Sequence, residues 1–294
     1  MRPRVLHAVR DPRRDGGRLR RVPGAGVLLS RPRPGARRST DWWRDYFDAQ
    51  YLLEYEPIFT PELARRDVAR AIELLGLPAS ARVLDVPCGQ GRHAHLLAEA
   101  GFRVDGLDYS RHLLARARER GTGPTLHYTR GDMRRLPARW TGRFDAVVNL
   151  FTSFGFFTDP RDDAATVAEW ARVLKPGGTL LWHGGNRDGV MARFLARDWW
   201  RTADGTIVAQ ERRFDPLAGQ LVIQSAWYGP GGHGEREHRI RLYTATALAQ
   251  LLARAGLIVE RAYDGWTDRP LGRTSGEMLL VARRDQLQRR RRPR

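Results

Sequence analysis

The chain has 294 residues, of which 41% are apolar, and a formal net charge of +18. This length allows one large domain or two small ones, and the apolar fraction is sufficient for a buried core, which excludes a wholly disordered chain. No uninterrupted apolar stretch approaches the ~20 residues that cross a bilayer, so no membrane partner is expected. The single cysteine, Cys88, excludes a disulfide framework and a multi-cysteine metal site, and no metal is expected. We therefore expect a cytoplasmic protein.

The positive charge is concentrated at the two ends of the chain. Residues 1–39 hold 12 Arg and 2 Asp, and residues 283–294 hold 7 Arg and 1 Asp, whereas residues 40–282 have a net charge of only +2. We expect a disordered tail rich in Arg, Pro and Gly at 1–39 and a basic tail at 284–294. Such tails can bind nucleic acid weakly, but the nearly neutral body argues against a large nucleic-acid footprint.

Helices are expected first in the ordered part of the chain. Asp41–Tyr55 is rich in aromatic residues and predicts an amphipathic helix. Pro61 then opens a second helix that ends before Gly76. An aromatic helix that precedes a sheet can exclude water from a site, so residues 41–76 are expected to form a helical lid.

Strands and helices then alternate, which predicts a parallel sheet with helices on both faces. The predicted strands lie at 82–86, 102–107, 125–129, 144–150 and 179–183. Residues 206–243 break this pattern, because three consecutive strands joined by Pro- and Gly-rich turns predict an antiparallel insertion. A helix at 246–255 and strands near 257–263 and 277–282 complete the body.

A Gly-x-Gly turn, Gly89-Gln90-Gly91, lies between the first of these strands and a helix. Such a turn lets a ligand approach the backbone, and the helix start supplies free N–H donors. With Asp108 lying 17 residues after Gly91, the segment also fits a dinucleotide-binding fingerprint. Asp85, four residues before Gly89, argues against that ligand because a carboxylate repels a pyrophosphate. It suits a ligand with an ammonium group.

Two further acids follow the next two strands. Asp108 ends the second strand, where a carboxylate can accept hydrogen bonds from both ribose hydroxyls. Asp132 and Met133 follow the third, where they can meet an adenine amino group and cover the ring. With residues 83–91 and 174–178, these motifs stand in the order and spacing of the class I S-adenosylmethionine (SAM)-dependent methyltransferases, which residues 41–283 resemble.

This resemblance implies both a fold and a cofactor. The fold is α/β, with a Rossmann-like seven-stranded sheet whose last strand is antiparallel, helices on both faces and an antiparallel β insertion. The insertion at 206–243 resembles the extra sheet of small-molecule members such as the glycine/sarcosine and amino-sugar N-methyltransferases (methyltransferase domain 25/11-like). The cofactor is SAM, and Arg66 resembles an arginine that meets its carboxylate. The other implied cofactor residues are Asp85, Pro87, Cys88, Gly89, Gly91, Asp108, Tyr109, Asp132, Met133 and Asn149. Pro87 stands where the family often has glycine.

The methyl acceptor is expected beyond the fourth strand. Residues 149–157 include four phenylalanines and small polar side chains, which suit an apolar pocket. The Asn-Pro-Pro-Tyr and Asp-Pro-Pro-Tyr motifs of many base-amine methyltransferases are absent. The sequence forces no catalytic residue, and His183 is the best candidate base because its reference pKa is near ~6.5. The candidate substrate-pocket residues are Tyr46, Tyr51, Phe154, Asn186 and Tyr243.

The predicted function is transfer of a methyl group from SAM to an oxygen or nitrogen of a small molecule, by a monomer or homodimer. Three alternatives stay open at this point. The Arg-rich tails allow an RNA or protein methyltransferase, the glycine turn allows an NAD-dependent oxidoreductase, and the fold also occurs in non-catalytic modules. The identity of the acceptor is not specified by the residues.

Overall fold

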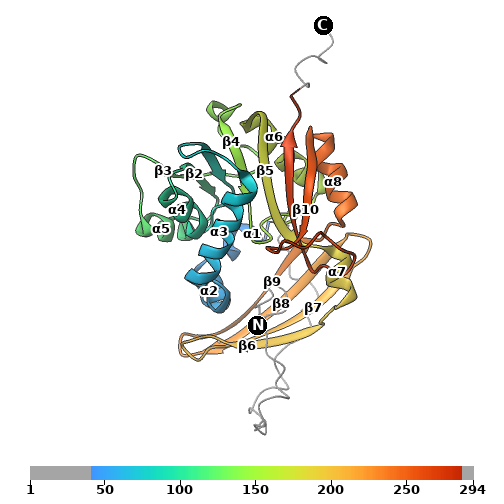
Figure 1. Cartoon of the computed structure of the whole chain (residues 1–294). Coiled ribbons are helices and arrows are strands. Elements are labelled where there is room, and N and C mark those ends of the chain that lie inside the picture. Colours follow the sequence, from blue (N-terminus) through green and yellow to red (C-terminus); the bar gives the residue numbers. More distant parts are fainter. Residues whose placement is uncertain (1–40, 287–294) are drawn as a thin grey trace.

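The structure is a computed structural model that describes residues 41–286. The tails expected at 1–39 and 284–294 lie almost wholly outside these residues. Two sheets form the body, and Figure 1 shows the smaller one below one end of the larger one. Among the helices at 41–286, none has both the length and the apolar character needed to span a membrane.

The N-terminal segment is a set of short helices followed by one long helix. Its elements are α1 (Trp43–Tyr46), α2 (Ala49–Tyr55), the 3-10 helix η1 (Glu56–Ile58) and α3 (Pro61–Leu75). The single helix expected at Asp41–Tyr55 is therefore two, because the Asp48 side chain accepts a hydrogen bond from the Tyr51 N–H and starts α2 afresh. The helix predicted from Pro61 has the expected end, with Gly76 in the left-handed conformation.

The larger sheet has seven strands in the order β10-β11-β5-β4-β1-β2-β3, and only β11 runs antiparallel to its neighbours. Its strands are β1 (Arg82–Asp85), β2 (Arg103–Asp108), β3 (Leu126–Arg130), β4 (Phe144–Asn149), β5 (Leu174–Gly185), β10 (Leu257–Asp264) and β11 (Glu277–Arg284). Its helices are α4 (Arg92–Glu99), α5 (Arg111–Arg120), α6 (Pro160–Val173) and α8 (Ala245–Arg254), with a 3-10 turn η2 (Ala138–Trp140). The predicted fold class is confirmed.

Consecutive residues of the central strands belong to two separate cores, as expected for a sheet covered on both faces. Leu180 and Trp182 of β5 pack in the core that includes α6 and α8, whereas Leu181 packs in the core beneath α3 and α4. The motif at 174–178 falls within β5. The strand is irregular at this segment, where Gly177 has a φ of +75°.

The smaller sheet has four antiparallel strands rather than the three expected at 206–243. They are β6 (Arg197–Arg201), β7 (Ile207–Asp215), β8 (Gln220–Gly229) and β9 (Gly232–Arg241), and the short helix α7 (Arg187–Ala192) precedes them. The extra strand β6 is a short edge strand with Arg at both ends, so its sequence lacks a clear apolar run.

A buried ion pair joins the N-terminal helices to this smaller sheet. The Arg236 guanidinium lies 2.9 Å from the Glu54 carboxylate, whose side chain is fully buried. Arg236 also donates to the Tyr46 carbonyl and to Asp48, and Trp200 of β6 donates to the Glu54 carbonyl. The N-terminal helices and the four-stranded sheet are therefore fastened together, and α2 lies beside that sheet in Figure 1.

Replacement of one member of this pair tests how strongly the two parts are joined. Arg236→Met leaves the Glu54 carboxylate buried without its cation, so we expect the free energy of unfolding to fall by about 3–5 kcal/mol. The double variant Glu54→Gln/Arg236→Met should recover much of that loss in urea unfolding. Arg65→Gln, which removes an exposed pair with Glu62, is the matched control and should change stability by less than about 1 kcal/mol. Equal losses in the single and double variants would contradict this account.

Candidate functional site

An open cleft of about 850 Å³ lies at the carboxyl ends of four neighbouring strands. The residues that line it come directly after β1, β2, β3 and β4, and from the N-terminal helices. Those from the strand ends are Pro87, Cys88, Gly89, Gln90, Leu107, Asp108, Tyr109, Gly131, Asp132, Met133, Leu150, Phe151, Ser153, Phe156 and Phe157. Those from the N-terminal segment are Trp43, Phe47, Tyr51 and Phe59. Ligands bind at this edge in open α/β sheets.

Asp108 holds the centre of the cleft together. One carboxylate oxygen accepts the Gly89 N–H at 2.8 Å and the other accepts the Ser110 N–H at 2.8 Å. Burial raises the pKa of Asp108 to about 6, and these backbone N–H groups oppose the rise. The carboxylate is therefore mostly ionised at pH 7, and each oxygen keeps a lone pair for a ligand hydroxyl.

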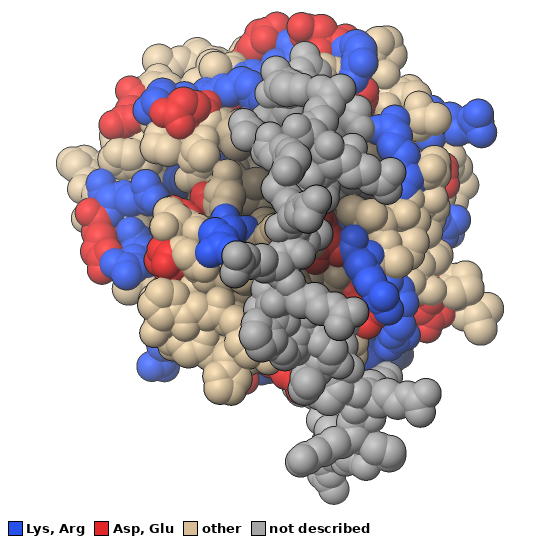
Figure 2. Space-filling view, turned by 90° about the horizontal axis from the view of Figure 1, so that it is seen from below, with Lys and Arg blue, Asp and Glu red and all other residues tan. Residues whose placement is uncertain are grey.

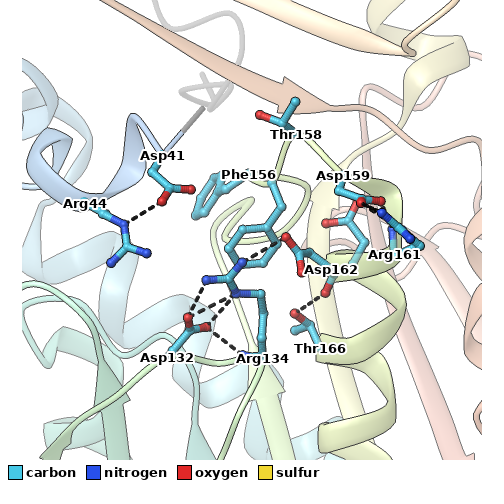
Figure 3. A network of polar contacts seen from close by, with 12 residues as sticks. Asp41, Arg44, Asp132, Arg134, Phe156, Thr158, Asp159, Arg161, Asp162 and Thr166 are labelled. Carbon is cyan, nitrogen blue, oxygen red and sulfur yellow. Dashed lines mark hydrogen bonds and ion pairs between the residues drawn. The ribbon is translucent and has the colours of Figure 1, made fainter. Parts of the chain in front are cut away.

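Asp132 is oriented by an arginine. Arg134 donates to both carboxylate oxygens of Asp132, with a shortest distance of 2.6 Å, and to Asp162 of α6 at 2.9 Å. Figure 3 shows Arg134 between the two acids. Although burial opposes it, this arginine lowers the pKa of Asp132, so the carboxylate is ionised at the cleft. The Arg134 guanidinium also lies 5.2 Å from the Trp43 ring and 4.5 Å from the Phe157 ring.

Asp85 and Asn149 lie beneath the cleft rather than on its wall. Asp85 is 1% exposed, and one of its carboxylate oxygens has no hydrogen-bond partner among residues 41–286. Burial raises its pKa to about 8, and the charge of Arg92 opposes this. Asn149 donates to the Val86 and Ser153 carbonyls at 2.7 and 3.2 Å. Asn149 therefore ties the loop after β1 to the loop after β4.

Gly91 also lies outside the wall, and it shapes the turn instead. Its φ is +74°, and a Cβ atom there would lie 2.5 Å from the Tyr128 hydroxyl. Only glycine combines this backbone conformation with so close a neighbour. Gly91 thereby directs the start of α4 toward the cleft.

The N-terminal helices directly contact the loop that follows β2. The Ser110 hydroxyl donates to the Phe47 carbonyl at 2.6 Å, and Arg44 donates to the Tyr109 hydroxyl at 2.6 Å. The Trp43 ring lies edge-on to the Tyr109 ring at 4.8 Å. These contacts close the cleft on one side with aromatic surface.

Besides Asp85, Asn149 and Gly91, five further predicted residues do not line the cleft. Arg66 pairs with Asp67 at 2.9 Å and keeps 46% of its side chain exposed, so it does not reach the predicted place. Tyr46 packs between Arg236 and His238. Phe154 stacks on Tyr243, whose hydroxyl donates to Asp163, and Asn186 donates to the Ser275 carbonyl. Of the candidate pocket residues, Tyr51 alone lines it.

His183 is also away from the cleft, which argues against its role as the base. Its side chain is fully buried, and its Nδ1 accepts the Phe151 N–H at 3.2 Å. Its Nε2 lies 3.3 Å from the Glu277 carboxylate, so both ring nitrogens are engaged. Phe151 and Thr152 have φ of 62° and 59°, a strained conformation for such residues, and His183 holds it. His183 is thus a positioning residue for the loop after β4.

Arg92 and His93 are cleft residues that were not predicted. His93 is buried at the cleft, and burial lowers its pKa to about 4, so it is neutral. Both residues come directly after Gly91 at the start of α4. This position at the mouth of a glycine turn was the signal that could have identified them.

The donor set fits SAM. Ionised carboxylates at Asp108 and Asp132 can accept hydrogen bonds from ribose and adenine, and Met133 offers apolar cover. Asp85 beneath the cleft has one carboxylate oxygen without a partner among residues 41–286, and the Arg92 cation lines the cleft. Burial raises the pKa of the Cys88 thiol well above its usual range, so the thiol stays protonated at neutral pH. At residues 41–286, no group of three His, Cys, Asp or Glu side chains is placed to hold a metal ion.

Comparisons with known proteins agree with this geometry. A methyltransferase-domain family model matches residues 83–178. A glycine/sarcosine N-methyltransferase of Halorhodospira halochloris is 31% identical to this chain. The match covers 60% of this chain and 64% of the length of that relative. A dTDP-3-amino-3,6-dideoxy-alpha-D-glucopyranose N,N-dimethyltransferase of Streptomyces fradiae is also 31% identical to this chain. The match covers 66% of this chain and 76% of the length of that relative.

A solved structure is similar over most of the body. It is a SAM-bound amino pentose methyltransferase from Micromonospora echinaspora, 26% identical, with a TM-score of 0.58 over 78% of this chain and 96% of that chain. The sheet order, the cleft at the strand ends and these relatives lead to one conclusion, and they leave the oxidoreductase alternative without support. The chain belongs to the class I SAM-dependent methyltransferases.

Proposed function

We propose that this enzyme transfers the methyl group of SAM to a nitrogen atom of a small molecule. The observation that carries the proposal is the aromatic closure of the cleft by its own N-terminal segment, through Trp43, Phe47, Tyr51 and Phe59. A cleft closed in this way suits a small acceptor rather than a folded macromolecule. The relatives named above act on an amino sugar and on glycine or sarcosine, which supports the same class.

The titratable groups at the cleft favour an amine over a hydroxyl acceptor. His93 has its pKa lowered to about 4, and the Asp108 carboxylate is committed to two N–H groups. Burial raises the pKa of the Tyr51 phenol well above its usual range. None of the three is suited to take a proton from an alcohol. A neutral amine already carries the lone pair that attacks, so it needs no strong base.

When bound, SAM supplies a methyl group on a sulfonium, from which a neutral thioether would depart as a good leaving group. The residues of this chain then have the tasks of binding and orienting. We infer that Asp108 holds the ribose hydroxyls, Asp132 meets the adenine amino group, and Met133 covers the ring. The aromatic residues of the N-terminal lid exclude water and align the acceptor, and such alignment contributes up to ~7–11 kcal/mol to catalysis in favourable cases.

The ribose role of Asp108 has a direct binding test. Asp108→Ala removes two charge-assisted acceptors, so we expect the affinity for S-adenosylhomocysteine to fall about 10- to 100-fold in calorimetric titration. Asp105→Asn is the matched control, because Asp105 lies on the same strand but pairs with Arg82 away from the cleft. Its affinity should stay within about threefold of wild type. Unchanged binding by a folded Asp108→Ala protein would refute the role.

The acceptor class is tested with isotopically labelled SAM. We expect label transfer to small amines, tried as glycine, sarcosine and a nucleotide-linked amino sugar, and none to analogues with hydroxyl in place of amine. Where residues 41–286 are visible on the face in Figure 2, basic and acidic side chains are interspersed and form no continuous basic surface of the kind that phosphate contacts require. Label found in RNA or protein, with none in the amines, would overturn the proposal.

The buried acid beneath the cleft predicts a pH-dependent stability. The pKa of Asp85 is about 8 in the folded protein and about 3.9 in an unfolded chain, so the folded state binds the proton more tightly. The contribution of Asp85 to the free energy of unfolding therefore falls as the pH rises from about 4 to 8. Asp85→Asn should remove that slope and raise the melting temperature at pH 8, with little change at pH 4.

An acid with the opposite shift is the control for this experiment. Lys175 and the Arg82 N–H lower the pKa of Asp145, although partial burial opposes them. Asp145→Asn should therefore lower the melting temperature at pH 8 and not raise it. Equal responses of the two variants in thermal unfolding would contradict the assigned ionisation of Asp85.

A further inference from the structure

The N-terminal helices rest on a segment of the cleft wall that has no regular structure. Residues 150–159 connect β4 to α6, and none of them belongs to a helix or strand. Phe156 and Phe157 of this segment line the cleft. The Phe156 ring lies 5.5 Å from the Trp42 ring, and the Phe156 carbonyl accepts the Trp42 indole N–H at 3.2 Å. The Phe157 ring lies edge-on to that of Trp43 at 5.6 Å. The position of these two phenylalanines therefore determines how the N-terminal helices meet the wall.

Arg241, the last residue of β9, holds the backbone of this segment from the side of the smaller sheet. Its N–H donates to the Gly155 carbonyl at 2.7 Å. Its guanidinium donates to the carbonyls of Phe157 at 3.2 Å and Thr158 at 2.8 Å. The side-chain bonds are charge-assisted, which makes them stronger than bonds between neutral groups. One residue outside the cleft thus binds three carbonyls of the cleft wall.

The backbones of the two segments are in close contact at Gly155. This residue has a φ of +87°, and a Cβ atom there would collide with the Arg241 carbonyl oxygen. Glycine is the residue that combines this conformation with so close an approach. The end of β9 and the wall segment are therefore packed backbone against backbone, so a shift of one displaces the other.

A buried acid orients the Arg241 guanidinium. Asp163 of α6 is fully buried and pairs with Arg241, whose side chain is 10% exposed. Asp163 also accepts the Tyr243 hydroxyl at 2.7 Å, and the Tyr243 ring stacks on that of Phe154. Hydrogen bonds are stronger where water does not compete for the donors and acceptors. This network therefore fastens the wall segment to both α6 and the smaller sheet.

We propose that Arg241 is a positioning residue for methyl transfer, which sets Phe156 and Phe157 where the N-terminal lid closes over the cleft. Arg241 does not line the cleft, so it acts through the backbone of residues 155–158. The smaller sheet thereby contributes to the site through the end of β9. The inference rests on the proposed function, because the lid is expected to close over SAM and the acceptor.

Backbone hydrogen exchange measures closure of the lid without an acceptor. Arg241→Lys keeps a charge beside Asp163 but loses the fork that binds two carbonyls. In protein saturated with S-adenosylhomocysteine, we expect amide exchange at 42–55 and 150–158 to become about 10-fold faster, with little change in β1, β2 and α4. Arg239→Lys is the matched control, because Arg239 lies on the same strand and pairs with Glu237. Its exchange should stay within about twofold of wild type.

A double variant separates the positioning role from a general loss of stability. If Arg241 acts through the phenylalanines, Phe156→Leu alone should speed exchange at 42–55, and the addition of Arg241→Lys should speed it by less than about threefold more. A purely structural role predicts faster exchange across the whole larger sheet and independent effects of the two substitutions. That result would overturn the proposal.

Methyl transfer from labelled SAM shows the consequence for the reaction. With glycine, sarcosine or a nucleotide-linked amino sugar as the acceptor, Arg241→Lys should lower kcat/KM about 10-fold and raise the KM of the acceptor, because a displaced wall aligns and binds it less well. A lower kcat with an unchanged KM, as expected from partial loss of folded protein, would contradict the role. If none of these acceptors were methylated, the proposed function would fail. Exchange at 42–55 in the ligand-free protein would then support the role of Arg241 if Arg241→Lys raised it, and refute the role if it did not.

Discussion

The site depends on one buried carboxylate, Asp108, that accepts N–H groups from two separate loops. Gly89 follows β1 and Ser110 follows β2, so the acid fixes the glycine turn against the start of α5. Ser110 in turn donates to the Phe47 carbonyl, which connects the same acid to the N-terminal helices. The position of the lid and the position of the inferred ribose contact are therefore set by the same few bonds.

The protein maintains this site at a cost in stability. Asp85 is buried without a full set of partners, and Arg92 is a buried cation whose terminal N–H groups have no acceptor among residues 41–286. Such groups destabilise a folded chain unless a ligand completes them. The large hydrophobic cores on both faces of the sheet offset this cost. The groups at the end of β1 and at the start of α4 that are available to a ligand therefore lower the stability of the ligand-free protein.

The sheet and most of the cleft were predictable because they depend on local patterns. Apolar runs with glycine turns give the strands, and acids at strand ends meet at one edge, as Asp108 and Asp132 do. The direction in which a side chain points is not determined by the local sequence. Arg66 turns to its neighbour Asp67, and Arg92 turns into the cleft, although both are arginines on nearby helices. The chemistry of His183 suggested a base, but its burial against Phe151 and Glu277 depends on distant packing.

A crystal structure of the complex with S-adenosylhomocysteine is the most direct test of the central claim, that the acids at the ends of β2 and β3 bind the cofactor. The account predicts the ribose hydroxyls at Asp108 and the adenine beside Asp132 and Met133. Adenosine bound away from Asp108 and Asp132, or in the reverse direction along the cleft, would contradict it.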